Sequence, residues 1–195
     1  MWPLGHLAVG YLAYSLWRRA RDGRPPRSGP VVVVLFASQL PDLIDKPLAW
    51  YFEVLPTGRT LGHSLLVMVP LCLLVLAIAR HRDRLAAGVA FVFGVMSHLL
   101  VDAMPALWRA EADATFLLWP LLPPVGFENG APEVTAMLLG SLTQPWFLFE
   151  FVLAGLALAL WLHDGRPGWL HDGRPGFDMA RHALERVGTD RDRGG

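Results

Sequence analysis

Apolar residues along the chain are gathered into five stretches, which cover roughly residues 4–17, 31–40, 61–79, 85–100 and 146–162. A helix that crosses a bilayer needs about 20 mostly apolar residues, and the last three stretches approach that length. The first two are shorter, so they either span the membrane, lie at its surface or pack inside a helical bundle. The pattern predicts an all-α integral membrane helical bundle of about five hydrophobic segments.

Proline residues predict where regular helix is interrupted. Leu40 precedes Pro41 and is biased away from helical backbone, so we expect a break there. The break would expose PDLID, residues 41–45, as a turn or as the start of a new helix. The Pro- and Trp-rich stretch WPLLPPVGF at 119–127 is typical of a loop at the membrane interface.

Composition supports a membrane location. Of the 195 residues, 53% are hydrophobic, eight are Trp, and the mean hydropathy is +0.38. This is more apolar than an ordinary soluble domain, so the lipid bilayer is the expected partner. The net charge of zero gives no indication of nucleic-acid binding. The single cysteine, Cys72, provides neither a disulfide framework nor a Cys-based metal motif.

Arginine is distributed unevenly among the connecting segments. Residues 18–27 hold five Arg, residues 80–84 hold three, and the tail after His163 holds six. Because cytoplasmic loops are enriched in Lys and Arg, these three segments are predicted to be cytoplasmic. In an inner membrane, five spans then place the N-terminus outside and the C-terminus in the cytoplasm. Residues 1–163 would form the membrane domain and residues 164–195 a disordered basic tail.

The tail contains the sequence WLHDGRPG twice, at 161–168 and at 169–176. Two copies are too few for a solenoid, so a duplication with solvated His–Asp pairs is expected. From Phe177 onward we expect one short basic helix and then a disordered end.

Six ionisable side chains are predicted at one depth, near the ends of the spans that lie opposite to the arginine-rich loops. SHLLVDAMP at 97–105 carries His98 and Asp102, which are four residues apart and project from one helical face. Isolated ionisable groups inside a bilayer are costly, which favours a partner or a bound metal. The six residues are His6, Asp42, Asp45, His63, His98 and Asp102.

Imidazole and carboxylate groups together bind zinc, manganese or iron, and mixed nitrogen and oxygen ligands are typical of hydrolytic sites. Each residue alone also has a simpler interpretation. His6 would be an interfacial residue, Asp42 a helix N-cap, and His63 or Ser64 the cap of another helix. Their shared depth favours a divalent metal, with zinc preferred.

Four segments resemble a family of membrane-bound, metal-dependent hydrolases of bacterial and archaeal inner membranes. They are HLAVGY near the N-terminus, QLPDLIDK at 39–46, GRTLGHSLL at 58–66 and SHLLVDAMP at 97–105, and the resemblance covers roughly residues 1–108. The order is also similar to that of the zinc-dependent phospholipase C and single-strand nuclease superfamily, helical enzymes that hydrolyse phosphoesters. The resemblance implies metal ligation by His6, Asp42, His63, His98 and Asp102, with Asp45 as a further ligand or as an acid that supports the ligands.

The same resemblance limits the number of metal ions. The superfamily uses further His and His-x-x-x-Glu ligands downstream. Here the later histidines, His163, His171 and His182, fall in the predicted cytoplasmic tail. One or two metal ions are therefore expected rather than three.

Glu150 and Arg59 are further candidates for the chemistry. Glu150 interrupts the last apolar stretch about 7 Å from its start at Pro145. It is a missing ligand, a general base, or a group that is protonated or paired with Arg59 or Arg109. Arg59 either binds a phosphate in bidentate fashion or anchors the chain at the interface.

Two classes of function remain. The first is a metal-dependent hydrolase at the extracytoplasmic membrane face, acting on an ester or phosphoester of a lipid or envelope-derived small molecule. In it, Asp45 or Glu150 would transfer the proton while the metal activates water. The second class is a non-catalytic metal-binding or scaffold membrane protein, which would use the same ligands.

Overall fold

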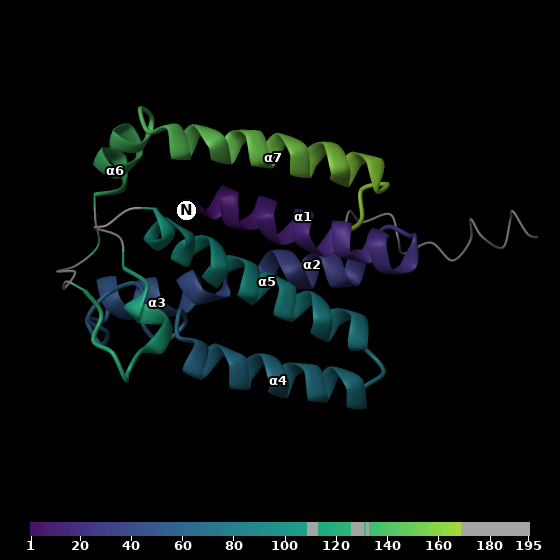
Figure 1. Cartoon of the computed structure of the whole chain (residues 1–195), viewed down its shortest axis with the longest axis horizontal. Coiled ribbons are helices and arrows are strands. Elements are labelled where there is room, and N and C mark those ends of the chain that lie inside the picture. The colour runs from purple at the N-terminus through teal and green to yellow at the C-terminus, as the bar shows by residue number, and fades with distance from the viewer. Residues whose placement is uncertain (109–112, 126–130, 132, 169–195) are drawn as a thin grey trace, which may run out of the picture.

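A computed structural model describes the chain except for residues 109–112, 126–130, 132 and 169–195 (Figure 1). All regular secondary structure in the described residues is helical, which confirms the all-α prediction. The helices are α1 (Pro3–Asp22), α2 (Ser28–Ala37), α3 (Leu40–Trp50), α4 (Leu65–His81), α5 (Leu85–Ala103), α6 (Val134–Ser141) and α7 (Pro145–His163), with the short 3-10 helices η1 (Met104–Leu107) and η2 (Thr115–Leu118). The predictions for the second WLHDGRPG copy and for the segment after Phe177 lie outside the described residues.

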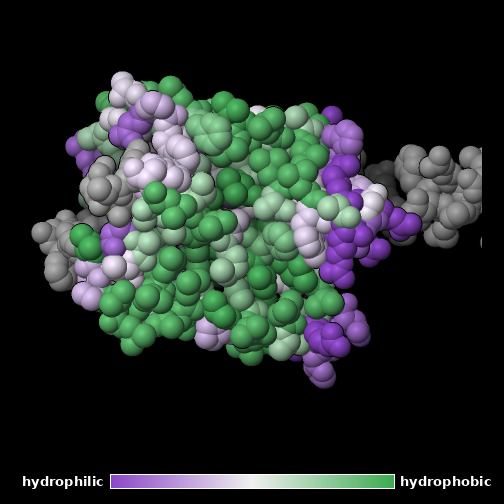
Figure 2. Space-filling model, in the orientation of Figure 1, coloured by the Kyte–Doolittle hydropathy of each residue, from purple (hydrophilic) through white to green (hydrophobic). Residues whose placement is uncertain are grey.

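The two ends of the helical bundle differ in polarity. One end, termed the arginine-rich end, holds the α1–α2 loop, the α4–α5 loop and the end of α7, and Figure 2 shows it as strongly hydrophilic. The opposite end, termed the site end, holds the start of α1, the helix α3 and the end of α5. Between the two ends the visible surface is mostly apolar (Figure 2). This distribution agrees with the uneven placement of arginine in the sequence.

Two helical segments among the described residues are long and apolar enough to cross a membrane, not the five that the hydrophobic pattern predicted. They are Leu85–Leu107 and Pro145–His163. α4 is apolar but has only 17 residues. α2 and α3 have 10 and 11 residues, so each extends only about 15 Å. α1 has 20 residues but ends in the charged sequence RRARD. The pattern identified the apolar segments correctly and overestimated how many qualify as spans.

α2 and α3 follow each other along the bundle and are separated by a break at Ser38 and Gln39, slightly earlier than predicted. Pro41 lies in the first turn of α3, where its missing N–H costs no hydrogen bond, so the new helix begins before the proline. Of the two alternatives predicted for PDLID, a turn or the start of a new helix, the structure has the second. Asp42 and Asp45 are buried, as a place in the predicted metal site requires, and in that respect the segment is not exposed by the break.

The central helix α5 packs against α1, α2 and α4. Gly94 faces the break between α2 and α3, and a Cβ atom there would lie 2.6 Å from the Val34 carbonyl oxygen and 2.8 Å from the Ser38 nitrogen. Only glycine allows α5 to approach so closely. His98 is four residues further along the same face of α5, so this contact brings it against Ser38.

The Trp- and Pro-rich loop is not helical in its described part, as predicted. Residues 119–125 form turns and irregular backbone. The Trp119 carbonyl oxygen accepts a hydrogen bond from Ser64 Oγ, and Ser64 is the N-cap of α4. The loop is thereby fastened to the site end.

A buried carboxylate ties α7 to α1 at the arginine-rich end. Asp164 accepts hydrogen bonds from Tyr11, Ser15 and Arg19, with 2.6 Å between Tyr11 Oη and Asp164 Oδ2. Burial alone would raise the pKa of Asp164, but these hydrogen bonds and the Arg19 charge outweigh it and hold the pKa below its usual value. The expectation of solvated His–Asp pairs is therefore wrong for Asp164, because polar groups of α1 replace water around its carboxylate. His163 is exposed.

We expect Asp164→Asn to lower the unfolding free energy at pH 7 by about 2 kcal/mol, because it removes the charge from a buried carboxylate that accepts hydrogen bonds from the partly exposed Arg19 and from two hydroxyl groups. Since the folded pKa of Asp164 is depressed, its stabilisation is complete above the unfolded pKa of about 3.9 and is lost as the pH falls through the folded value. Thermal unfolding in detergent should thus show a difference in unfolding temperature between wild type and variant that becomes smaller below about pH 4. Asp22→Asn, in a partly exposed pair with Arg18 one helical turn away, is the control and should change stability by less than about 0.5 kcal/mol. Equal effects of the two variants would contradict this interpretation.

Candidate metal centre

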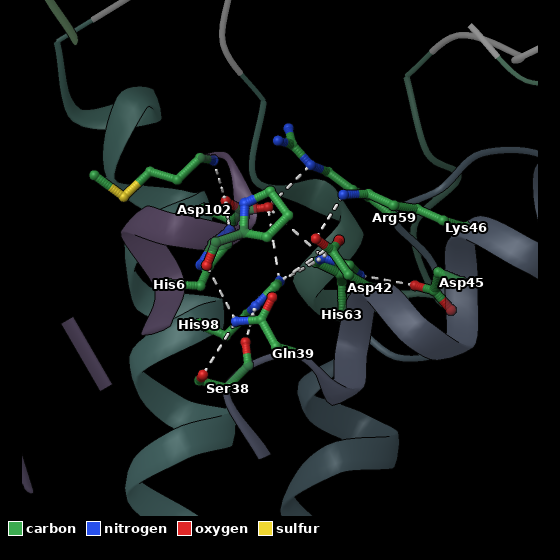
Figure 3. A network of polar contacts seen from close by, with 12 residues as sticks. His6, Ser38, Gln39, Asp42, Asp45, Lys46, Arg59, His63, His98 and Asp102 are labelled. Atoms are coloured by element: carbon green, nitrogen blue, oxygen red, sulfur yellow. Dashed lines mark hydrogen bonds and ion pairs between the residues drawn. The ribbon is translucent and has the colours of Figure 1, made fainter. Parts of the chain in front are cut away.

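The six ionisable side chains predicted at one depth converge at the site end of the bundle (Figure 3). Each of the six residues is at most 8% exposed. They come from α1 (His6), α3 (Asp42 and Asp45), the loop before α4 (His63) and α5 (His98 and Asp102). Four separate segments of the chain thus enclose one polar cluster, termed the His–Asp cluster.

Asp102 is the acceptor at the middle of the cluster. Its Oδ1 atom lies 2.8 Å from the Met1 amino nitrogen and 3.3 Å from His6 Nε2. Its Oδ2 atom faces three further nitrogen atoms, which are Arg59 Nε at 3.2 Å, His63 Nε2 at 3.6 Å and His98 Nε2 at 4.0 Å. The last contact confirms that His98 and Asp102 share one helical face.

Asp45 determines which nitrogen of His63 carries the proton. The Asp45 carboxylate accepts the backbone N–H groups of Thr60 and Gly62, both at 2.7 Å, and its Oδ2 atom lies 2.8 Å from His63 Nδ1. An ionised carboxylate can only accept, so His63 Nδ1 donates. The Nε2 atom of neutral His63 therefore directs a lone pair into the cluster.

The helix break orients His98 in the same way. His98 Nδ1 lies 2.7 Å from the carbonyl oxygen of Ser38. Ser38 is the C-cap of α2, where carbonyl oxygens have no partner within the helix. Because a carbonyl oxygen only accepts, Nδ1 of His98 is the donor and its Nε2 atom also carries a lone pair.

The two Nε2 atoms of His63 and His98 lie only 3.1 Å apart. Asp42 Oδ1 lies 3.6 Å from the first and 3.8 Å from the second, and Asp102 Oδ2 faces both. Lone pairs at this separation repel unless a positive charge lies among them. A proton can supply it: burial lowers the pKa of His63, but hydrogen bonds with Asp102 and Asp45 outweigh burial and raise it. A divalent cation fits the same nitrogen and oxygen donors.

His6 adds a third imidazole to the cluster. Its ring stacks on His98 with 3.8 Å between the ring centroids and an interplanar angle of 16°. His6 Nδ1 is buried and has no hydrogen-bond partner in the described part of the chain, and Nε2 has only the 3.3 Å contact with Asp102, which lacks hydrogen-bond geometry. An unpartnered buried polar group is costly, and ligation of a metal ion would remove that cost.

Among the residues that the structure describes, two sets of three place ligand atoms within 4.8 Å of one another. One set is His6, His98 and Asp102, and the other is Asp42, His63 and His98. These are the five residues that the family resemblance implies as ligands. His98 belongs to both sets, but its Nδ1 atom is bonded to the Ser38 carbonyl, so Nε2 is the atom that can bind a metal ion. His98 can therefore bind one ion, and a second ion would depend on the other residues.

Two cationic side chains stand at the rim of the cluster. The Arg59 side chain is 50% exposed and contacts Asp102. The Lys46 side chain is 31% exposed, with its Nζ atom 2.5 Å from Asp42 Oδ2. Each therefore touches a carboxylate of the cluster and also reaches solvent. An anion that approaches the cluster would meet both positive charges.

Glu150 is buried beside the His–Asp cluster but contacts a different group. Both of its carboxylate oxygens lie 3.1 Å from the backbone nitrogen of Trp2, the N-cap of α1. Gly5 permits this approach, because a Cβ atom there would lie 2.7 Å from Glu150 Oε2. Arg59 contacts Asp102 in the described structure, and Arg109 lies outside it. Glu150 thus anchors the turn of α1 that carries His6.

Sequence reasoning missed the backbone groups that hold the histidines. The Ser38 carbonyl and the N–H groups of Thr60 and Gly62 have no side-chain signature. The available signal was Pro41, which predicts an interruption of regular helix near the residues before it, where the Ser38 carbonyl lies. Of the two proposed caps for α4, Ser64 is the one used, since its side chain accepts from the Leu66 N–H group.

A sequence profile for the family described as YdjM inner membrane protein matches residues 1–170. The match covers every helix described above and the entire His–Asp cluster. A search of curated proteins and a search of solved structures each found no match.

We expect zinc added to chelator-treated protein to raise the unfolding temperature of wild type. At a free concentration 100 times the dissociation constant, the stabilisation would be about 2.7 kcal/mol. His98→Ala should lose this shift and the bound zinc found by elemental analysis. His81→Ala, at the exposed end of α4, is the matched control and should retain both. A shift of the same size in all three proteins would place the zinc elsewhere.

Proposed function

Because the chain belongs to the YdjM family of inner membrane proteins, we propose that its His–Asp cluster is the metal centre of a membrane-bound hydrolase of ester or phosphoester bonds. The order of its ligands is similar to that of the zinc-dependent phospholipase C and single-strand nuclease superfamily. The proposal extends this likeness to the reaction. Zinc is the preferred ion, with manganese or iron as alternatives.

One observation carries the proposal: two histidines with fixed tautomers aim their Nε2 lone pairs at the same point between two carboxylates. A hydrogen-bonded structural pair needs only one donor and one acceptor. Here both nitrogens are acceptors, and the compensating charge must come from outside the neutral side chains. The arrangement is preorganised for a cation.

A divalent cation bound there would polarise a carbonyl or phosphoryl oxygen and lower the pKa of water. Arg59, at the rim, would orient an anionic substrate oxygen through its guanidinium group, and Lys46 would add a second positive charge. Asp45 already accepts three N–H groups, which favours a positioning role through His63. Glu150 accepts the Trp2 N–H group, which favours a role in positioning the turn of α1 that carries His6. Transfer of the proton by either acid stays a prediction.

The location of the cluster supports an extracytoplasmic site. It lies at the opposite end of the bundle from the arginine segments 18–27 and 80–84. Positive loops favour the cytoplasmic side, so the site end would face the other side of the inner membrane. The substrate would then be a lipid or a small molecule of the envelope.

We expect the purified protein, loaded with zinc or manganese, to hydrolyse p-nitrophenyl phosphate, bis(p-nitrophenyl) phosphate or p-nitrophenyl butyrate. His98→Ala and Asp102→Asn should lower kcat/KM at least about 100-fold, because each removes a ligand. Arg59→Ala should raise KM for the phosphoesters more than it lowers kcat. His81→Ala serves again as the control.

The two function classes give different results in this assay. Metal that binds through the cluster without turnover of any of the three probes would favour the non-catalytic metal-binding or scaffold alternative. Wild type that cannot be loaded with any of these metals would exclude both.

The topology is tested separately with alkaline phosphatase, which is active only outside the cytoplasm. Fusions after Arg27, after Arg84 and after residue 195 should be inactive, and a fusion after Glu53 should be active. Activity at any of the first three positions would reverse the sidedness or change the number of crossings.

A further inference from the structure

α7 is joined to α1 by polar contacts at both ends and leaves an apolar gap between them. Asp164 binds α1 at the arginine-rich end, and Glu150 binds the Trp2 N–H group at the site end. Between these contacts the small side chains of Ala8, Ala154 and Ala157 lie at the interface of the two helices. A groove of about 230 Å³ remains there.

The walls of the groove are apolar along its length. Leu4 and Leu7 line it on α1, and Leu35 lines it on α2. Tyr11 and Trp161 line it toward the arginine-rich end. Tyr11 directs its hydroxyl away to Asp164, and the Trp161 indole N–H donates to the Pro167 carbonyl oxygen. The groove therefore offers hydrocarbon contacts and no free polar group from these rings.

The groove is continuous with the surface that faces lipid. α7 is a membrane-spanning candidate of which only 17% is buried, and Leu156 and Leu158 on it are more than half exposed. Hydrocarbon chains are the molecules present at such a surface. An entire helix is about 10 Å wide and does not fit a groove of this volume. Part of one flexible acyl chain does, with the remainder of the chain in the surrounding lipid.

The groove points along α1 toward the His–Asp cluster. From Leu4 to Tyr11 it extends about 10 Å, since a helix rises 1.5 Å per residue. Its Leu4 end lies in the same helical turn as His6, and the adjacent Pro3 carbonyl oxygen accepts from the Gln39 amide at the α2–α3 break. A chain whose head-proximal part is seated in the groove would thus place its polar end beside the cluster and run toward Tyr11.

We propose that this groove holds the head-proximal part of one acyl chain of a membrane lipid whose phosphate-bearing head is presented to the His–Asp cluster. The inference rests on the proposed hydrolase function and names its substrate class. Arg59 and Lys46 at the rim supply the positive charge that a lipid phosphate needs. The hydrolysis would add water across the phosphoester bond, releasing inorganic phosphate and the lipid alcohol.

The test fills the groove and leaves the cluster intact. Ala154→Phe places a large ring in the groove, and Ala159→Phe makes the same change at an exposed position of the same helix. Dioleoyl phosphatidic acid is the lipid probe, its binding measured by native mass spectrometry and its turnover by released phosphate. p-Nitrophenyl phosphate is the soluble probe.

We expect Ala154→Phe to weaken lipid binding and to slow lipid turnover, each at least tenfold, with unchanged turnover of the soluble probe. Ala159→Phe should behave as wild type in all three measurements. Equal lipid binding by the two variants would overturn the proposal that the groove binds the acyl chain. If Ala154→Phe loses lipid binding but wild type hydrolyses neither probe, the groove stands as a lipid site and the hydrolase proposal fails.

A second variant tests the groove independently, in case Ala154→Phe does not fold. Leu7→Ala removes a side chain from the wall and enlarges the groove. It should strengthen binding of a lipid with a branched acyl chain relative to dioleoyl phosphatidic acid, by at least threefold compared with wild type. An unchanged preference would overturn the assignment of the groove to the acyl chain.

Discussion

The functional end of this protein depends on two imidazole rings whose protons are held away from each other. The Asp45 carboxylate accepts the Nδ1–H of His63, and the Ser38 carbonyl accepts the Nδ1–H of His98. Both Nε2 atoms therefore point toward the same place, and they lie 3.1 Å from each other. In a buried setting this repulsion demands a cation or a proton. The Asp45 carboxylate, the Ser38 carbonyl and the close approach at Gly94 hold these two rings in place.

The break between α2 and α3 is the structural device that makes this possible. It frees the Ser38 carbonyl, it starts α3 so that Asp42 and Asp45 turn inward, and Gly94 lets α5 come close enough for His98 to reach it. A continuous helix would satisfy that carbonyl internally and would leave His98 without its donor contact. The interruption of the helix therefore loses one helical hydrogen bond, and the carbonyl that it leaves unpaired fixes the orientation of the His98 ring.

The remaining polar groups inside the bundle fasten α7 to α1. Asp164 and Glu150 act near opposite ends of α7, and each carboxylate is satisfied by groups of the N-terminal segment, including the Trp2 N–H and the Tyr11 hydroxyl. Buried acids without such partners would be costly in an apolar surrounding. This pattern explains why a mostly exposed helix remains attached, and why apolar space is left between its two anchor points.

The sequence by itself determined the helical class, the apolar segments, the polarity of the two ends and the shared depth of the six ionisable residues, because these follow from the periodicity and order of side chains. It did not determine which segments qualify as spans, where the α2–α3 break falls, or that Asp164 is buried. Those features depend on close approach between helices, as at Gly94, and on backbone groups such as the Ser38 carbonyl, the Thr60 N–H and the Trp2 N–H. Backbone donors and acceptors are the same in every sequence except at proline, so only the tertiary structure decides which of them meet a histidine or an acid.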